Sequence, residues 1–169
     1  MRSQTTLLGA AGEHFVVSEL LRRGYIGTIA PQGVPNADIL VPNIGGARLC
    51  SIQVKSRRDI GSDGGWHMNV KHESLHSDKL FYCFVDFGKT ENKRPKVYVV
   101  PSGIVANVVT SSHKQWLADP GKRGQPHRDS KVRRFLPAYK HIPYPTGWLD
   151  KYKDAWHQLG LRGEVAMEP

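Results

Sequence analysis

The run from Leu49 to Ser56 alternates between apolar and polar side chains, and it constrains the fold more than any other stretch. The apolar positions are Cys50, Ile52 and Val54, and the polar positions between them are Ser51, Gln53 and Lys55. Successive side chains of a strand point to opposite faces. The run therefore predicts a β-strand with one face on a core and the other on a cleft or solvent.

The rest of the chain predicts a mixed α/β fold around this strand. Further strands are expected at 25–30, 37–41, 80–87 and 96–100, and helices at 3–24 and at 102–117, the second capped by Ser102. Leu149, Tyr152, Trp156 and Leu159 form a stripe that predicts a last helix from Thr146 to Gly160. We expect a mixed central sheet flanked by helices, as in a restriction-endonuclease-like α/β/α core.

The length of 169 residues suits a single domain. Within it, we expect a core at 1–118, a basic loop region at 119–141, and a C-terminal helix within 142–169 that packs on the core. The basic excess is uneven, because residues 114–141 carry eight basic and two acidic side chains. The whole chain has 24 Lys and Arg against 15 Asp and Glu, a formal charge of +9, which favours a polyanion as partner.

Two features predict a cytoplasmic protein that does not span a membrane. The two cysteines, Cys50 and Cys83, lie in apolar runs and are interpreted as small buried hydrophobes, since two cysteines cannot form a disulfide framework. Neither a secretory signal nor an apolar run of membrane-spanning length is recognisable in the sequence.

Two acids, an amide and a lysine can meet at one point of the predicted fold. Asp38 lies at the start of one strand, and the short connection 42–47 joins that strand to the one that carries Gln53 and Lys55. Glu13 lies in the apolar stripe of the first helix, which must pack on the sheet, and an unpaired carboxylate there would be costly. Oxygen ligands of this kind hold Mg²⁺ or Mn²⁺, and a neighbouring lysine can orient a water for phosphodiester hydrolysis.

The order Glu13, Asp38, Gln53-Val54-Lys55 resembles the signature of the PD-(D/E)XK nuclease superfamily. The stretch from Gly12 to Gly24 also resembles the entry helix of archaeal Holliday-junction resolvase-like members. Ala37 stands where the family name has proline, and Gln53 stands where most members have an acid. A Gln-x-Lys variant of the motif is familiar from Mrr-type restriction endonucleases.

The resemblance implies metal ligation by Asp38, Gln53 and Glu13, with help from the Val54 backbone carbonyl, and a catalytic role for Lys55. It implies Mg²⁺ or Mn²⁺ as the cofactor, and branched or specific-sequence DNA as the substrate. A homodimer would suit the cutting of two strands. We expect phosphate contacts from the cations after the motif and in the basic region: Arg57, Arg58, Lys122, Arg123, Arg128, Lys131, Arg133 and Arg134.

Two other functions fit the same sequence. A non-catalytic nucleic-acid-binding module that keeps the nuclease fold gains weight from Gln53, which leaves two carboxylates where a conventional site would have three. A basic structural or partner-binding protein is the third interpretation. Each candidate residue also has a structural reading: Glu13 in an ion pair, Asp38 capping a turn, and Gln53 and Lys55 on an exposed edge strand.

Overall fold

The computed structural model describes residues 4–60, 64–140 and 142–161, which form a mixed α/β fold. A five-stranded sheet has the order β1-β2-β3-β5-β6, with only the β3–β5 pair parallel. The strand bounds are β1 Thr28–Ile29, β2 Ile39–Pro42, β3 Leu49–Arg57, β5 Leu80–Asp86 and β6 Lys96–Pro101. A separate antiparallel ribbon pairs β4 (Trp66–Asn69) with β7 (Val132–Phe135). The predicted mixed sheet flanked by helices is confirmed.

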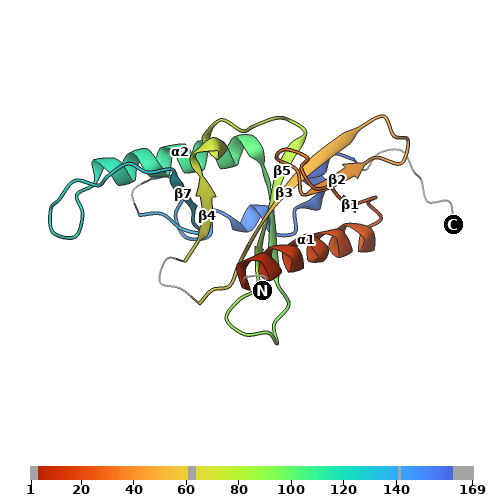
Figure 1. The fold of residues 1–169 in the computed structure, drawn as a ribbon, viewed down its shortest axis with the longest axis horizontal. Helices are drawn as coiled ribbons and strands as arrows, with labels where there is room; N and C mark the ends of the chain where they lie inside the picture. Colours follow the sequence, from red (N-terminus) through yellow and green to blue (C-terminus); the bar gives the residue numbers. More distant parts are fainter. Residues whose placement is uncertain (1–3, 61–63, 141, 162–169) are drawn as a thin grey trace.

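Two helices cover opposite faces of the five-stranded sheet (Figure 1). Helix α1 (Gln4–Arg22) packs on the face made by the apolar side chains of β3. Helix α2 (Ser102–Ala118) lies on the other face together with the β4–β7 ribbon. The short helix η1 (Val70–Glu73) follows β4 and also contacts α2. Helix, sheet, and helix with ribbon therefore form three layers.

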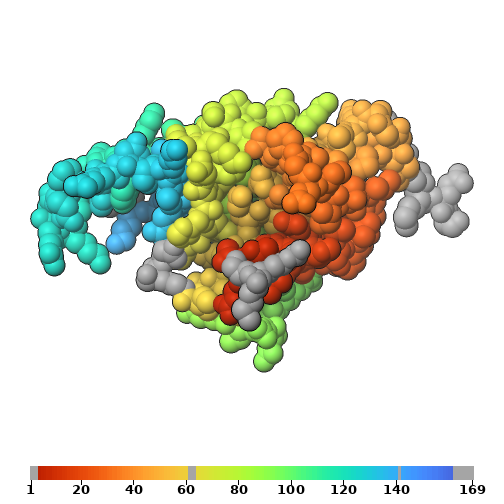
Figure 2. Space-filling view, in the orientation of Figure 1, coloured from red at the N-terminus to blue at the C-terminus, as the bar shows by residue number. Residues whose placement is uncertain are grey.

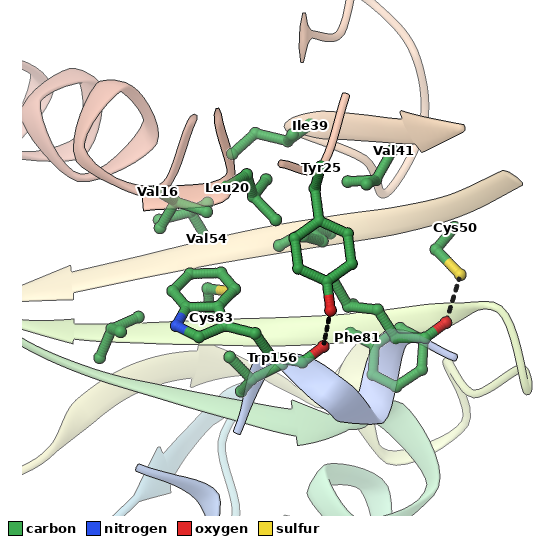
Figure 3. Packing of buried hydrophobic residues seen from close by; sticks show 14 of the residues in the cluster. Val16, Leu20, Tyr25, Ile39, Val41, Cys50, Val54, Phe81, Cys83 and Trp156 are labelled. Atoms are coloured by element: carbon green, nitrogen blue, oxygen red, sulfur yellow. Dashed lines mark hydrogen bonds between the residues drawn. The ribbon is translucent and has the colours of Figure 1, made fainter. Parts of the chain in front are cut away.

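The core beneath α1 contains the apolar set expected from the alternation in β3. Cys50, Ile52 and Val54 are buried there with Val16 and Leu20 of α1. Two hydrogen bonds attach the C-terminal segment to this core (Figure 3): the Tyr25 hydroxyl donates to the Trp156 carbonyl at 3.1 Å, and the Cys50 thiol donates to the Leu159 carbonyl at 3.4 Å. Cys50 and Cys83 are both unpaired and buried, as predicted.

Helix α1 ends as predicted but buries only part of the expected apolar stripe. Gly24 has a positive φ of 79°, and its N–H and that of Tyr25 bond to the carbonyls of Leu21 and Leu20, which closes the helix. Of the residues expected in the apolar stripe, Leu20 is fully buried, as is Val16, whereas Leu7 and Leu21 are more than half exposed. The buried face is narrow because Gly12 and Glu19 share it.

The cap predicted for α2 is wrong, although the predicted helix is present. The residue at the cap position is Pro101, and Ser102 is the first helical residue. The Ser102 hydroxyl instead donates to the Ser77 carbonyl at 2.9 Å and accepts from the Ser77 N–H at 2.9 Å. Its role is to hold the loop before β5 against the helix.

The C-terminal helix predicted from Thr146 to Gly160 is absent from the described residues. Two short 3₁₀ helices stand there, η2 (Asp150–Tyr152) and η3 (Trp156–Leu159). Asp154 between them has a positive φ of 50°, and its N–H bonds to the Val97 carbonyl at 3.0 Å. Pairing with the edge strand β6 thus interrupts the helix, yet the expected stripe from Leu149 to Leu159 is buried as predicted.

A buried carboxylate, Glu19, fastens the end of α1. It accepts hydrogen bonds from Arg22 at 3.3 Å, Arg23 at 2.7 Å and Arg94 at 2.6 Å. Burial alone would raise the pKa of Glu19, but the hydrogen bonds from the arginines outweigh burial and lower it from 4.5 to about 2. Because the pKa is lowered in the folded state, this contribution to stability is complete above pH 4.5 and is lost as the pH falls toward 2.

We expect Glu19→Gln to lower the free energy of unfolding at neutral pH by about 1–2 kcal/mol, since exposed Arg22 and Arg94 are partly screened by solvent. The variant should also lose less stability than the wild type between pH 5 and about pH 3. Urea unfolding at both pH values measures this, with Glu91→Gln as control because Glu91 is exposed in its ion pair with Arg58. An identical pH dependence in wild type and Glu19→Gln would contradict the assignment.

Candidate active site

The candidate site lies in a notch where β3 extends beyond its neighbour β2. Strand β3 pairs with β2 only from Leu49 to Ile52, but with β5 from Ser51 to Arg57. Asp38 stands immediately before β2, so its side chain occupies the edge of β3 that a longer strand would have covered. Figure 2 shows β3 at the floor of a hollow bordered by α1 (red), residues 31–40 (orange) and the segment from β4 onward (yellow).

The Asp38 carboxylate is anchored to β3 by two hydrogen bonds. Oδ2 accepts from the Val54 backbone N–H at 2.7 Å and from the Gln53 side-chain amide. The Asp38 N–H in turn donates to the Ile52 carbonyl at 2.9 Å. The carboxylate thus accepts a hydrogen bond from a strand N–H that has no partner strand. Gln53, only 8 % exposed, lies beside the Asp38 carboxylate. The predicted meeting of Asp38 and Gln53 is observed.

Glu13 reaches the same site from α1. Burial raises the pKa of its carboxyl, and the negative charge of Asp38 raises it further, whereas His14 and Lys55 act in the opposite direction. Asp38, Lys55 and Glu13 therefore lie within electrostatic reach of one another although they come from three separate elements. The structure brings together the two acids, the amide and the lysine that the sequence analysis singled out.

A glycine sets the close approach of α1 to β3. A Cβ added to Gly12 would stand 1.8 Å from the Ser56 Oγ, 3.1 Å from the Ser56 Cβ and 3.4 Å from a Val54 methyl. The Ser56 hydroxyl is buried and has no hydrogen-bond partner among the described residues. Glu13 follows Gly12 directly, so this close approach brings the backbone of Glu13 near β3.

We expect Gly12→Ala to destabilise the fold by about 1–3 kcal/mol, because the added methyl overpacks the contact with Ser56. Ser56→Ala alone should be close to neutral, since it removes a buried hydroxyl without a partner. Added to Gly12→Ala, it should recover part of the loss. A double-mutant cycle of urea unfolding measures the coupling. Strict additivity of the two substitutions would rule out the contact.

Lys55 is the cation of the site, and its environment lowers the pKa of its ammonium group. Burial lowers the pKa of Lys55, and the positive charge of Lys71 adds to this. Asp38 and Glu13 oppose the shift without reversing it. A lysine in such surroundings releases its proton more readily than an exposed lysine does, and the resulting amine can accept a proton.

Three residues beside the site were missed in the sequence. Lys71 of η1 donates to the Asn36 side-chain oxygen at 3.3 Å, next to Asp38. Behind the site, buried His72 and Tyr82 share a hydrogen bond of 2.7 Å, and Tyr82 lies opposite Gln53 in the parallel pair β3–β5. Burial and the charges of Lys55 and Lys71 lower the pKa of His72 to about 4, so it is neutral at physiological pH.

Two arginines expected to contact phosphate are used inside the fold. Arg57 binds the Asp86 carboxylate at 2.6 Å, donates to the Gly64 carbonyl and lies 4.3 Å above the centre of the Trp66 ring. Arg133 is 5 % exposed and pairs with Glu73. It belongs to β7, so the expectation of a loop throughout 119–141 is wrong for this strand. Both guanidinium groups are therefore engaged by partners within the fold.

The other expected cations lie at the surface. Arg58 is ion-paired with exposed Glu91 at 2.8 Å. The remaining exposed cations are Lys122, Arg123, Arg128, Lys131 and Arg134. The segment after α2 projects beyond the helix in Figure 1. A cavity of about 320 Å³ lies between α2 and the segment that follows Asp129, and Arg133 and Arg134 line it. Glu13, Asp38, Gln53 and Lys55 do not line it.

The notch contains several oxygen donors, and its two carboxylates carry two negative charges. Such a set suits a hard cation. Within the described part of the chain, no cluster of three or more His, Cys, Asp and Glu side chains is close enough to hold a metal. The groups that could hold a cation are instead two carboxylates, the Gln53 amide oxygen and the Val54 carbonyl. Gln53 presents its nitrogen to Asp38 here, and a half-turn of the amide group exchanges its nitrogen and oxygen ends.

Comparison with known proteins adds a likeness of fold. No protein-family model and no curated protein matches the sequence. Among solved structures, the bacterial homing endonuclease I-Ssp6803I matches with a TM-score of 0.52 over 95 % of this chain and 94 % of that chain, at 16 % identity. The chain therefore shares the α/β fold of that protein. Among the described residues, no helix is long and apolar enough to cross a membrane.

Proposed function

We propose that this protein is a metal-dependent DNA endonuclease of the PD-(D/E)XK type. The observation that carries the proposal is the convergence of Asp38, Gln53 and Lys55 with Glu13 in one notch. Each residue comes from the element that the superfamily signature implies. The likeness of fold to a homing endonuclease supports the same class of activity.

The donor set supports Mg²⁺ or Mn²⁺ as the cofactor. Asp38, Glu13 and Gln53 would hold the cation, together with the Val54 carbonyl, and all four donors are oxygen atoms of the kind that hard cations prefer. When bound, such a cation neutralises charge at phosphorus and acidifies a water. It would also relieve the repulsion between Asp38 and Glu13, which raises the pKa of Glu13 in the free protein.

Lys55 would act on the attacking water. Its Nζ lies within the electrostatic influence of both carboxylates, and burial lowers the pKa of the ammonium group. The neutral amine can accept the proton that the water loses as its oxygen attacks phosphorus, while the ammonium form can stabilise charge on the phosphate. The departing sugar oxygen leaves with the bonding electron pair and takes a proton from solvent.

DNA as the substrate is supported by charge. The chain carries +9, and exposed cations stand on the segment after α2 and on β7. Cations on a projecting loop can follow a phosphate backbone and position the protein without reading sequence. Such contacts would weaken steeply with added salt.

Incubation with supercoiled plasmid tests the proposal. We expect nicked or linear products with Mn²⁺ or Mg²⁺, and none with a chelator in excess. The non-catalytic alternative is favoured by one observation, the amide of Gln53 in place of a third carboxylate. Retarded migration of the plasmid without cutting under either metal would select that alternative.

A further inference from the structure

We infer that the β4–β7 ribbon reads base sequence in the major groove of the DNA, an inference that rests on the proposed function. The ribbon is separate from the five-stranded sheet, and its two strands pair Trp66 with Phe135 through to Asn69 with Val132. One of its faces is built into the fold and the other is exposed. The exposed face lies beside the catalytic notch.

The inner face fixes the ribbon rigidly. Trp66, Met68 and Phe135 are buried against Phe84 and the apolar side of α2. Arg133 completes this face. Its guanidinium forms an ion pair with Glu73 of η1 and donates hydrogen bonds to the Ser130 and Val132 carbonyls. A recognition element held in this way can place its outer side chains with little loss of entropy on binding.

The outer face carries side chains that can read bases. It consists of His67 and Asn69 of β4 with Val132 and Arg134 of β7, and all four are exposed. His67 and Arg134 stand directly opposite each other in the register. Arginine recognises guanine through its O6 and N7 acceptors, asparagine suits adenine, and an apolar side chain can contact the thymine methyl group.

The dimensions and charge of the ribbon fit the major groove. Strands of four residues are about 13 Å long and lie about 5 Å apart. The groove is about 12 Å wide, and it admits a two-stranded β-ribbon. Exposed Lys131 and Lys71 flank the ribbon. Of the nearby acids, Glu73 is paired with Arg133 and Asp129 with His113. Asp119 lines the cavity beside Arg134, and the three cations Arg134, Lys131 and Lys71 still leave the outer face and its rim positive, as a polyanion requires.

The connection from the ribbon to the notch is short. Helix η1 follows Asn69 directly, and the Asn69 side chain accepts from the Lys71 N–H at 3.1 Å. Lys71 then reaches Asn36 beside Asp38, and its charge acts on Lys55. In Figure 2, the surface of β4 and the following residues lies on the same face as the hollow over β3. A duplex that seats the ribbon in its groove therefore passes over the notch.

Selection from a randomised duplex DNA pool, with chelator present so that no strand is cut, tests the inference. Bound duplexes are recovered and sequenced for the wild type, for Arg134→Lys, and for the control Arg48→Lys on the exposed β2–β3 turn. We expect the wild type to enrich guanine at one position or more. Arg134→Lys keeps the charge but loses the bidentate fork, so this enrichment should fall about 5- to 100-fold. Affinity for the unselected pool should change little, and Arg48→Lys should select as the wild type does.

Three results would overturn the inference: no enriched sequence with the wild type, the same enrichment with Arg134→Lys, or an equal effect of the Arg48→Lys control. His67→Ala and Arg134→Ala provide a second measurement, because a phosphate contact would weaken binding to all duplexes alike without altering the enriched sequence. The assay contains no metal. A wild type that selects a sequence but never cuts with Mn²⁺ would therefore refute the nuclease while supporting the ribbon.

Discussion

Asp38→Asn is expected to reduce metal-dependent cleavage of plasmid by about 10²- to 10⁴-fold while the protein stays folded. The substitution removes the negative charge that would hold the cation. It keeps the size of the side chain and an oxygen that can still accept from the Val54 N–H, so the edge of β3 remains satisfied. Initial rates of nicking at saturating Mn²⁺, together with the thermal midpoint of unfolding, measure the two effects.

Asp78→Asn is the matched control for this substitution. Asp78 is an exposed carboxylate in the loop before β5, so the same chemical change there should leave cleavage near the wild-type rate. An Asp38→Asn protein that cuts as fast as the wild type would show that the site is elsewhere. If Asp38→Asn and Asp78→Asn lost cleavage activity equally, the change in net charge would be the cause.

Substitution of Lys55 is expected to remove turnover and leave DNA binding almost intact. Lys55→Met should lower the cleavage rate by about 10²- to 10⁴-fold, since no amine is left to act on the water. One cation among 24 contributes little to long-range attraction, so the affinity for duplex DNA without metal should change less than about threefold. Lys96→Met, at an exposed position that begins β6, is the control.

A second variant at this position separates the two roles of Lys55. Lys55→Arg keeps a positive charge, but a guanidinium does not release its proton in the accessible pH range. If Nζ accepts a proton from water, Lys55→Arg should be nearly as slow as Lys55→Met. If charge on the phosphate is the main role, Lys55→Arg should recover much of the rate. Loss of binding equal to the loss of cutting in both variants would instead make Lys55 a phosphate contact.

Much of the notch could be predicted because it depends on local pattern. The alternation in β3 fixes which side chains share the face of Gln53 and Lys55, and the short β2–β3 connection makes Asp38 their neighbour. The start of β2 at Ile39, one residue after Asp38, has no signal in the pattern. The anchoring of the Asp38 carboxylate on the Val54 N–H follows from that late start and could be found only in the structure.

The errors have a common physical cause, which is tertiary contact overriding local pattern. The stripe from Leu149 to Leu159 has helical spacing, but pairing with β6 breaks it into two 3₁₀ helices. In β7, Arg133 stands on the core face because Glu73 neutralises it, so the strand did not show an apolar alternation. His72 and Tyr82 reach the site only through the packing of η1 on β5.

The metal dependence of Gln53 variants tests the central claim most directly. Mn²⁺ and Mg²⁺ are titrated into wild type, Gln53→Glu and Gln53→Ala, and cleavage and the heat of binding are both recorded. A glutamate adds a third negative charge at nearly the same size, so Gln53→Glu should lower the metal concentration for half-maximal cleavage, and Gln53→Ala should raise it. Mn²⁺ should act at lower concentration than Mg²⁺ in the wild type. Superimposable titrations for all three proteins would mean that Gln53 does not bind the cation, which would contradict the account of the site.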